Sequence, residues 1–197
     1  MFTGIVQGVG TVRAIEARGV DVTIVIDTGA LSLDGVEPGG SIAVSGVCLT
    51  ATRLDAAGFA ADVSRETLSL TTLGLWMPGS RVNIEKALLA GQALGGHYVT
   101  GHIDGVAEVT DRRDDGRSVR MAFAVPPALG HYVARKGSVC LDGVSLTVNG
   151  AEANRFDVNL VPHTLEVTTL GDYRPGTRIN LEVDIIARYV ERMMRPG

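Results

Sequence analysis

Hydrophobic and polar residues alternate along short stretches of this chain, and glycine-containing turns separate the stretches. Residues 20–26, VDVTIVI, have the alternation of a half-buried strand, and the other stretches share their enrichment in Val, Ile and Thr. The stretches that we predict to be strands are 20–26, 41–52, 58–63, 81–84, 118–124, 138–148 and 155–160. Helical periodicity is almost absent before the carboxyl end, although short helical turns fit residues 29–36 and 126–135.

The last segment has the pattern of an amphipathic helix. Residues 184–194 place Ile186, Tyr189 and Met193 on one helical face, and Asp184 is available as the N-cap. An apolar face at the end of a chain has to be buried. It packs either on its own domain or on another subunit, and the pattern leaves both alternatives open.

The sequence repeats itself at an offset of 100 − 3 = 97 residues. Residues 100–106, TGHIDGV, repeat the shape of residues 3–9, TGIVQGV. The same offset aligns three later pairs without a gap: 40–50 with 137–147, 66–74 with 163–171, and 78–85 with 175–182. This period exceeds the roughly 20–50 residues of a solenoid repeat and approaches the size of a small domain. We therefore predict a tandem duplication of one domain.

Short strands at a spacing of roughly 8–12 residues are typical of sandwiches and closed barrels. Closure removes the bare edges of a small antiparallel sheet, which favours the barrel. We predict an all-β fold of two tandem six-stranded Greek-key barrels, related by internal duplication, plus a C-terminal α-helix. The predicted boundaries are 1–97 for the first barrel, 98–184 for the second and 185–197 for the helix.

Composition excludes several classes of partner. Hydrophobic content of 45% and 25 glycines describe a globular chain rich in turns, and a net charge of −4 with scattered Lys and Arg argues against nucleic acid. No apolar run approaches the roughly 18 residues of a membrane span, and the start resembles no leader, so we expect a cytoplasmic protein without a membrane partner. Cys48 and Cys140 occupy non-equivalent repeat positions and are predicted to be free thiols.

Known catalytic signatures are missing. The chain has no Walker-type phosphate loop and no Gly-x-Ser-x-Gly motif, and we predict no metal because no Cys/His cluster has ligand spacing. His97 and His102 are five residues apart, which on a strand directs their side chains to opposite faces. A lone histidine such as His102 is more often a satisfied polar residue than a catalyst, so its position alone does not decide its role.

One pair of equivalent segments points to binding. Cys48-Leu49-Thr50 and Ser145-Leu146-Thr147 each follow a Gly-Val pair and place a nucleophilic or hydrogen-bonding side chain two residues from a threonine. Residues two apart lie on one face of a strand, and a nearby glycine permits close approach of a ligand. Each half is thus predicted to contain one pocket wall.

Seven segments that together span essentially the whole chain carry a family resemblance. They are MFTGIVQGVG, GVCLT, ETLSLTTLG, GGHYVTGHIDGV, GSVCLDGVSLTVN, NLVPHTLEVTTLG and RINLEVDIIARYVER. In this combination they resemble the riboflavin synthase family, the alpha-chain type built of two lumazine-binding repeats. One departure is visible, because the family usually has asparagine before Gly46 and this chain has Ser45, aligned with Asp142.

The resemblance implies an enzyme of riboflavin biosynthesis that needs no cofactor. It would transfer a four-carbon unit between two molecules of 6,7-dimethyl-8-ribityllumazine, giving riboflavin and 5-amino-6-(D-ribitylamino)uracil. The family forms homotrimers held partly by the C-terminal helix, with each site between the first barrel of one subunit and the second of another, and lumazine synthase is a candidate partner. The alternative is a non-catalytic relative that binds a lumazine or flavin as a fluorescent antenna. The second repeat keeps His102, Ser145, Thr147 and His163, which favours the enzyme.

The resemblance also implies site residues. The first-repeat pocket would use Gly4, Ile5, Val6, Cys48, Leu49, Thr50, Asp62, Ser64, Glu66 and Thr67. Its counterpart would use Gly101, His102, Ile103, Ser145, Leu146, Thr147, Val161, His163 and Thr164, with Lys136 reaching in from a neighbouring chain. The implied catalysts are His102, Ser145, Thr147, Cys48 and Asp184, with Phe2 as an aromatic neighbour of the ring. Their individual roles as base or nucleophile stay open.

Overall fold

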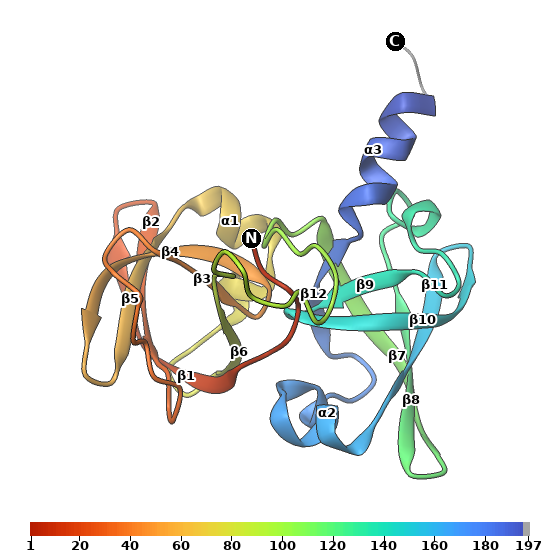
Figure 1. The fold of residues 1–197 in the computed structure, drawn as a ribbon, viewed down its shortest axis with the longest axis horizontal. Coiled ribbons are helices and arrows are strands. Elements are labelled where there is room, and N and C mark those ends of the chain that lie inside the picture. Colours follow the sequence, from red (N-terminus) through yellow and green to blue (C-terminus); the bar gives the residue numbers. More distant parts are fainter. Residues whose placement is uncertain (195–197) are drawn as a thin grey trace.

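Two closed barrels, each of six antiparallel strands, make up most of the computed structural model, which describes residues 1–194 (Figure 1). The first barrel has the strand order β1-β2-β5-β4-β3-β6, and the second has the equivalent order β7-β8-β11-β10-β9-β12. The strands of the first barrel are β1 (Gly8–Arg18), β2 (Asp21–Asp27), β3 (Ser41–Val44), β4 (Val47–Asp55), β5 (Gly58–Val63) and β6 (Arg81–Lys86). Those of the second are β7 (Gly105–Asp115), β8 (Ser118–Ala124), β9 (Ser138–Leu141), β10 (Val144–Glu152), β11 (Arg155–Leu160) and β12 (Arg178–Val183).

Each strand of the second barrel begins and ends 97 residues after its counterpart. The predicted duplicated all-β fold is therefore confirmed, whereas the exact domain boundaries stay predictions. Equivalent positions fill the two cores: Ile24 and Met121 are fully buried, as are Ile84 and Leu181. Burying a side chain of this size contributes roughly 1.5–3 kcal/mol, so the inward face of every strand stabilises closure.

Two tight turns divide stretches that we predicted to be single strands. Ser45 and Gly46 separate β3 from β4, and Asp142 and Gly143 separate β9 from β10. All four have positive φ angles between 42° and 81°. The turns lie against each other, since a Cβ at Gly46 would lie 2.8 Å from the Gly143 backbone nitrogen. Glycine is required there because a side chain would collide with the other barrel.

Short helices follow β5 and β11, and the pattern of hydrophobic and polar residues did not predict them. They are α1 (Arg65–Leu70), α2 (Pro162–Val167) and the 3₁₀ turns η1 (Thr72–Leu75) and η3 (Thr169–Asp172). Six residues are too few to show a periodic pattern, so the local signals are the Ser64 cap of α1 and Pro162 in the first turn of α2. Of the two predicted helical turns, 126–135 contains η2 (Gly130–Tyr132), whereas 29–36 forms turns without a helix.

Reciprocal hydrogen bonds join the two barrels. The Asn83 Nδ2 donates to the carbonyl of Asp142 at 2.9 Å, and its Oδ1 accepts from the Thr169 N–H at 2.8 Å. Asn180, 97 residues later, makes the equivalent bonds to the first barrel. Its Nδ2 donates to the Ser45 carbonyl at 2.9 Å, and its Oδ1 accepts from the Thr72 N–H at 2.7 Å. Both asparagine side chains are buried, so they satisfy backbone groups that water cannot reach.

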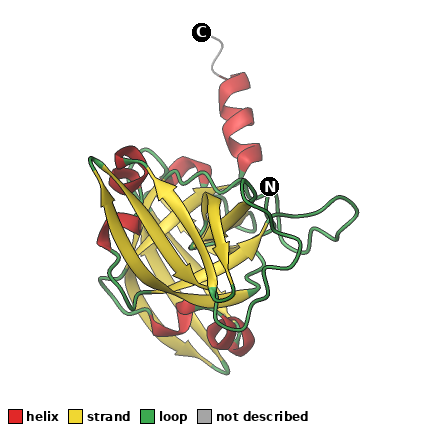
Figure 2. Ribbon diagram, turned by 90° about the vertical axis from the view of Figure 1, so that its left-hand side faces the viewer, coloured by secondary structure: helices red, strands yellow, loops and turns green. Residues whose placement is uncertain are grey.

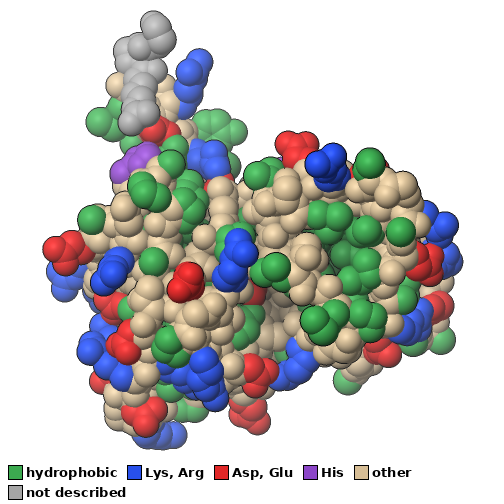
Figure 3. Space-filling view, turned by 180° about the vertical axis from the view of Figure 1, so that it is seen from behind, with side chains coloured by type: hydrophobic (Ala, Val, Ile, Leu, Met, Phe, Trp, Pro, Cys, Tyr) green, Lys and Arg blue, Asp and Glu red, His purple; other side chains and the backbone are tan. Residues whose placement is uncertain are grey.

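The terminal helix α3 (Ile185–Met194) projects outward from the second barrel, which it contacts through polar side chains (Figures 2 and 3). The Asp184 carboxylate accepts from the Ile186 N–H at 3.0 Å, which confirms the predicted N-cap. Tyr189 is 66% and Met193 80% exposed, so the apolar face of α3 does not pack on its own domain. Residues 195–197 of the predicted trimerisation helix lie outside the described residues. No helix among residues 1–194 is long and apolar enough to span a membrane.

Candidate functional site

The segment before each barrel crosses to the other barrel. We call residues 2–6 the first arm and residues 99–103 the second arm. The Gly4 carbonyl accepts from the N–H of Ser145 on β10 at 2.7 Å. The Gly101 carbonyl accepts from the N–H of Cys48 on β4 at 2.9 Å. Each predicted wall is thus covered by the arm of the opposite half.

The predicted grouping of the pocket residues stays a prediction, but within one chain each arm contacts the opposite barrel. The Gly4 carbonyl bonds Ser145, and Val6 packs against the core of the second barrel. Ile103 packs against the core of the first barrel. The 97-residue offset identifies equivalent residues but carries no information about which barrel an arm contacts. The backbone hydrogen bonds of each arm show which barrel that arm contacts.

The arms meet in a short antiparallel bridge. The Phe2 N–H donates to the Val99 carbonyl at 2.7 Å, and the Val99 N–H donates back at 3.2 Å. Phe2 is fully buried, in a cluster with Ala43, Val99 and Cys140. Its ring fills the junction between the barrels, and its role as an aromatic neighbour of a ligand ring stays a prediction.

The first wall lies on the outer face of β4. Cys48 is half-buried and Thr50 is exposed, whereas Leu49 is 4% exposed and belongs to the barrel core. Cys48 and Thr50 therefore lie together on the outer face of β4, as their spacing predicted, and the Leu49 side chain points into the barrel. Both cysteines are free thiols, as predicted, and Cys140 is buried.

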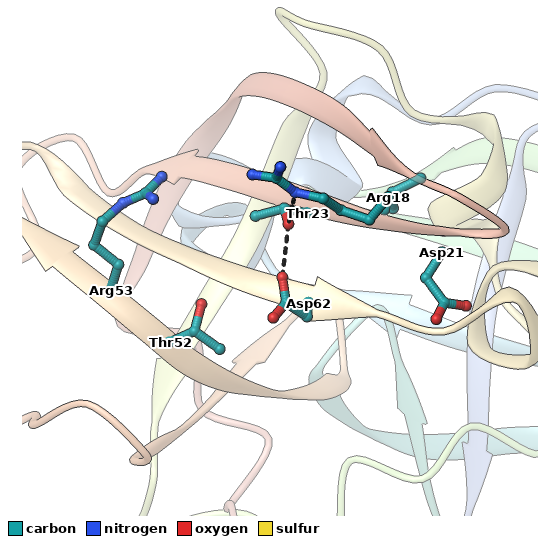
Figure 4. A pocket seen from close by; sticks show the side chains of 7 residues that line it. Arg18, Asp21, Thr23, Thr52, Arg53 and Asp62 are labelled. Atoms are coloured by element: carbon teal, nitrogen blue, oxygen red, sulfur yellow. Dashed lines mark hydrogen bonds between the residues drawn. The ribbon is translucent and has the colours of Figure 1, made fainter.

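Asp62 extends the outer surface of the first barrel on β5. Its Oδ1 accepts from the Thr23 hydroxyl of β2 at 2.6 Å, which fixes the carboxylate (Figure 4). It borders a cavity of about 630 Å³ whose other lining residues are Arg18, Asp21, Val22, Thr23, Thr52 and Arg53. These residues belong to the neighbouring strands β1, β2, β5 and β4, and Figure 4 shows their side chains around the cavity. Hydroxyl and carboxylate groups of this kind suit a polyhydroxylated ligand chain.

Ser64, Glu66 and Thr67 lie at the start of α1, directly after Asp62 and β5. The Ser64 hydroxyl caps the helix by accepting from the Thr67 N–H at 3.2 Å. In the second repeat Val161 replaces Ser64, no side chain caps α2, and Pro162 occupies the first turn instead. His163 is exposed at the position of Glu66, and Thr164 is half-buried at that of Thr67. The N-terminal turns of α1 and α2 are therefore similar in shape and different in charge.

The second wall contains a contact that sequence reasoning missed. Ser145 is half-buried, Thr147 is exposed and Leu146 packs against the core. The His97 Nδ1 lies 2.7 Å from the Ser145 hydroxyl. His97 lies at the boundary between the two repeats, outside the aligned pairs of segments. The alignment of the repeats therefore offered no signal for it.

His97 is suited to accept a proton. It is 8% exposed, and its Nε2 has no hydrogen-bond partner among the described residues. Burial lowers the pKa of the ring, and the nearby negative charge of Asp184 opposes this shift. A ring with a lowered pKa is neutral at pH 7 and can accept the Ser145 hydrogen at Nδ1.

The other predicted residues lie at the margins of the two walls. His102 is exposed on the second arm, beside the first wall, and its N–H donates to the Thr100 hydroxyl at 3.2 Å. Lys136 is exposed just before β9 and has a φ of 67° where the first repeat has Gly39. Asp184 is half-buried between β12 and α3. The described fold thus brings Asp184, His97 and Ser145 into one neighbourhood.

The paired barrels with crossed arms define a tandem lumazine-binding protein, since the lumazine binding domain model matches residues 3–87 and 100–184. The chain belongs to the riboflavin synthase family. It is 46% identical over 199 residues to riboflavin synthase of Mycobacterium tuberculosis (strain ATCC 25618 / H37Rv), covering 99% of this chain and 98% of that protein. It is 45% identical over 194 residues to that of Photobacterium phosphoreum, covering 98% and 89%.

Solved structures share the architecture. The chain superposes on the structure of LumP complexed with 6,7-dimethyl-8-(1'-D-ribityl) lumazine with a TM-score of 0.83, at 25% identity. For LumP complexed with riboflavin the TM-score is 0.85 at 26% identity. Both alignments cover 93% of this chain and 99% of LumP. LumP, which shares this architecture, therefore binds both a lumazine and a flavin.

Proposed function

We propose that the chain catalyses the dismutation of 6,7-dimethyl-8-ribityllumazine. One molecule gives a four-carbon unit to a second, and the products are riboflavin and 5-amino-6-(D-ribitylamino)uracil. The observation that carries the proposal is the pair of equivalent but chemically different walls, Cys48 with Thr50 and Ser145 with Thr147. Two walls of one shape suit two copies of one ligand, and their different side chains suit a donor and an acceptor.

Positioning provides much of the catalysis in this proposal. The methyl group at C7 of the lumazine is acidic because its anion delocalises into the ring, so the reaction needs orientation and proton transfer. Holding two ligands in a reactive register contributes roughly 7–11 kcal/mol in good cases. We assign binding of the ribityl hydroxyls to Asp62, Ser64 and Glu66 in one pocket and to His163 and Thr164 in the other.

The two walls differ in how their nucleophile is activated. A serine hydroxyl is a weak nucleophile and needs an adjacent base, whereas a cysteine thiol ionises near pH 8.5 without one. His97 lies within hydrogen-bond distance of Ser145, at 2.7 Å. We therefore assign Ser145 as the residue activated for attack on the acceptor ring, with His97 as its base. No step requires a bound cofactor, so we propose a cofactor-independent transferase.

We propose that the active unit is a homotrimer. The exposed face of α3, with Ile186, Tyr189 and Met193, is an apolar surface that a neighbouring copy would cover. Lys136, exposed beside the second barrel, would then reach the site of a neighbour. Sedimentation should give the mass of three chains, and Tyr189→Glu should shift it to that of one. A monomeric wild-type protein would contradict the trimer.

The setting of the enzyme is also part of the proposal. Two unpaired thiols fit a reducing compartment, which supports the cytoplasm. The lumazine substrate has to be made by another enzyme, so lumazine synthase is the candidate partner. Co-sedimentation of the two purified proteins tests that contact.

The central experiment is anaerobic incubation of the purified protein with 6,7-dimethyl-8-ribityllumazine alone. We expect riboflavin and the uracil product in equal amounts, each at half the substrate consumed, without added metal or cofactor. Chromatography of the quenched mixture measures both. Tight binding of the lumazine without turnover would overturn the enzyme and indicate an antenna protein.

A further inference from the structure

A buried glutamate holds each arm. Glu85 on β6 is 3% exposed. Its Oε1 accepts from the backbone N–H of Thr3 at 2.7 Å and from the Thr3 hydroxyl at 2.6 Å, and its Oε2 accepts from the Gly4 N–H at 3.0 Å. All the donors belong to the first arm, and the carboxylate lies in the first barrel.

Glu182 on β12 repeats this arrangement. It is also 3% exposed. Its Oε1 accepts from the N–H and hydroxyl of Thr100, both at 2.7 Å, and its Oε2 accepts from the Gly101 N–H at 2.9 Å. The two glutamates are 182 − 85 = 97 residues apart, so the duplication preserved the carboxylate and all three of its donors.

Gly4 and Gly101 each lie between a glutamate and the opposite wall, in close contact with that wall. The Gly101 N–H bonds Glu182, and the Gly101 carbonyl bonds the Cys48 N–H on the other barrel. A Cβ at Gly101 would lie 2.5 Å from the Cys48 Cβ, so the arm is in close contact with the wall. At Gly4 a Cβ would lie 2.6 Å from the Ser145 Cβ.

We infer that Glu85 and Glu182 are positioning residues for the wall of the opposite barrel: Glu182 sets the arm over Cys48, and Glu85 sets the arm over Ser145. A substitution in one repeat therefore alters the site of the other repeat. The inference deepens the proposed function, because it names the groups that align the two ligand walls. It does not require turnover.

The side chain has to be a carboxylate. Each glutamate faces three donors and has two acceptor oxygens, which accommodates all of them. Glutamine keeps the size but places an NH₂ donor against an N–H donor in either orientation of its amide. Burial raises the pKa of both carboxyl groups, and the hydrogen bonds from the arms oppose this shift. A Glu→Gln change thus releases an arm with little change in volume.

The test compares Glu182→Gln with its matched control, Glu85→Gln. The Cys48 thiol is half-buried beneath the second arm, whereas Cys140 is buried and should not react in the native protein. Iodoacetamide modification, located by mass spectrometry, therefore reports on the first wall. We expect Glu182→Gln to accelerate modification of Cys48 about tenfold or more, because hydrogen bonds to a charged group are lost. Glu85→Gln should leave the rate near that of wild type.

Protection by riboflavin gives a second readout. The concentration of riboflavin that protects Cys48 should rise about tenfold in Glu182→Gln and stay unchanged in Glu85→Gln. Equal acceleration in both variants would indicate general loosening and overturn the inference. Unchanged rates in both would overturn it as well.

A second pair of substitutions, at the threonine donors, keeps the test decisive if a glutamine variant fails to fold. Thr100→Val and Thr3→Val each remove one hydroxyl donor, and only Thr100→Val should affect Cys48. A wild-type protein that makes no riboflavin would contradict the proposed function while leaving these thiol rates interpretable. The two failures are therefore distinguishable.

Discussion

His97 gives the second wall a base within hydrogen-bond distance of its nucleophile, Ser145. We expect His97→Gln to lower kcat by roughly 10²–10⁴-fold, because glutamine can hydrogen-bond Ser145 but cannot take its proton. Stopped-flow assays with the lumazine give kcat, and fluorescence quenching gives the Kd for riboflavin, which should stay near wild type. A Kd that weakens as much as kcat falls would make His97 a packing residue.

The lowered pKa of His97 also predicts how kcat falls at acid pH. Burial keeps the pKa of His97 below its ordinary value of 6.5, so the ring should remain neutral as the pH falls to that value. We expect wild-type kcat to hold down to about pH 6.5 and to fall only below it, as the ring protonates. The His97→Gln profile should lack this limb. A profile that falls already above pH 7 would contradict the assignment.

Asp142 is a buried acid at the joint between the barrels. Burial raises its pKa to about 7, partly offset by hydrogen bonds from Tyr173 and Asn180. Because the folded pKa exceeds the unfolded value of 3.8, the folded state binds the proton more tightly. Its stabilising contribution is complete below pH 3.8 and is lost as the pH rises to about 7.

We therefore predict that Asp142→Asn removes this pH dependence. Asparagine resembles the protonated carboxyl, so the variant should gain about 2–4 kcal/mol relative to wild type between pH 4 and pH 7. Urea unfolding at several pH values measures the difference. Parallel stability curves for the two proteins would contradict the raised pKa.

At the scale of the element, α3 is tied to the second barrel by its polar side. Arg188 forms an ion pair with Asp104, whose side chain is only 3% exposed, and lies 5.8 Å from the Tyr132 ring centroid. Arg188→Ala leaves the Asp104 carboxylate without this cation. We expect a loss of about 1–3 kcal/mol in the free energy of unfolding, below the value for a fully buried pair because Arg188 is 45% exposed.

Arg192→Ala is the control, since Arg192 is exposed in the last turn of the same helix. Its effect should stay within about 0.5 kcal/mol. Urea unfolding of both variants under identical conditions makes the comparison. Equal losses would mean that the Asp104 contact contributes nothing specific.

At the scale of the whole molecule, the barrels should unfold together. Asn83 and Asn180 connect them through buried hydrogen bonds, so wild type should show one urea transition by fluorescence and circular dichroism. Asn83→Ala leaves a backbone carbonyl and an N–H unpaired and should cost about 2–4 kcal/mol. The double variant Asn83→Ala/Asn180→Ala should split the transition in two. A single transition there would locate the coupling elsewhere.

The sequence by itself determined the duplication, the barrels and the family, because these depend on periodicity and on equivalent positions along the chain. The Cys48-x-Thr50 spacing correctly placed both side chains on the outer face of β4. Residues 20–26 were correctly predicted as a strand, but residues 23–26 of β2 are all buried, so burial does not alternate there as predicted. The α3 cap at Asp184 was also readable, since a cap and its helix are adjacent in sequence.

Only the tertiary structure decided which segments meet. The crossing of the arms, the burial of Phe2 and the contact between His97 and Ser145 join residues far apart in the chain. Periodicity encodes which face of a strand is buried, but not which of two equivalent barrels an arm will contact. That choice is made by the backbone bonds that cross between the halves, those of Phe2 with Val99, Gly4 with Ser145 and Gly101 with Cys48, which form only when both halves have folded.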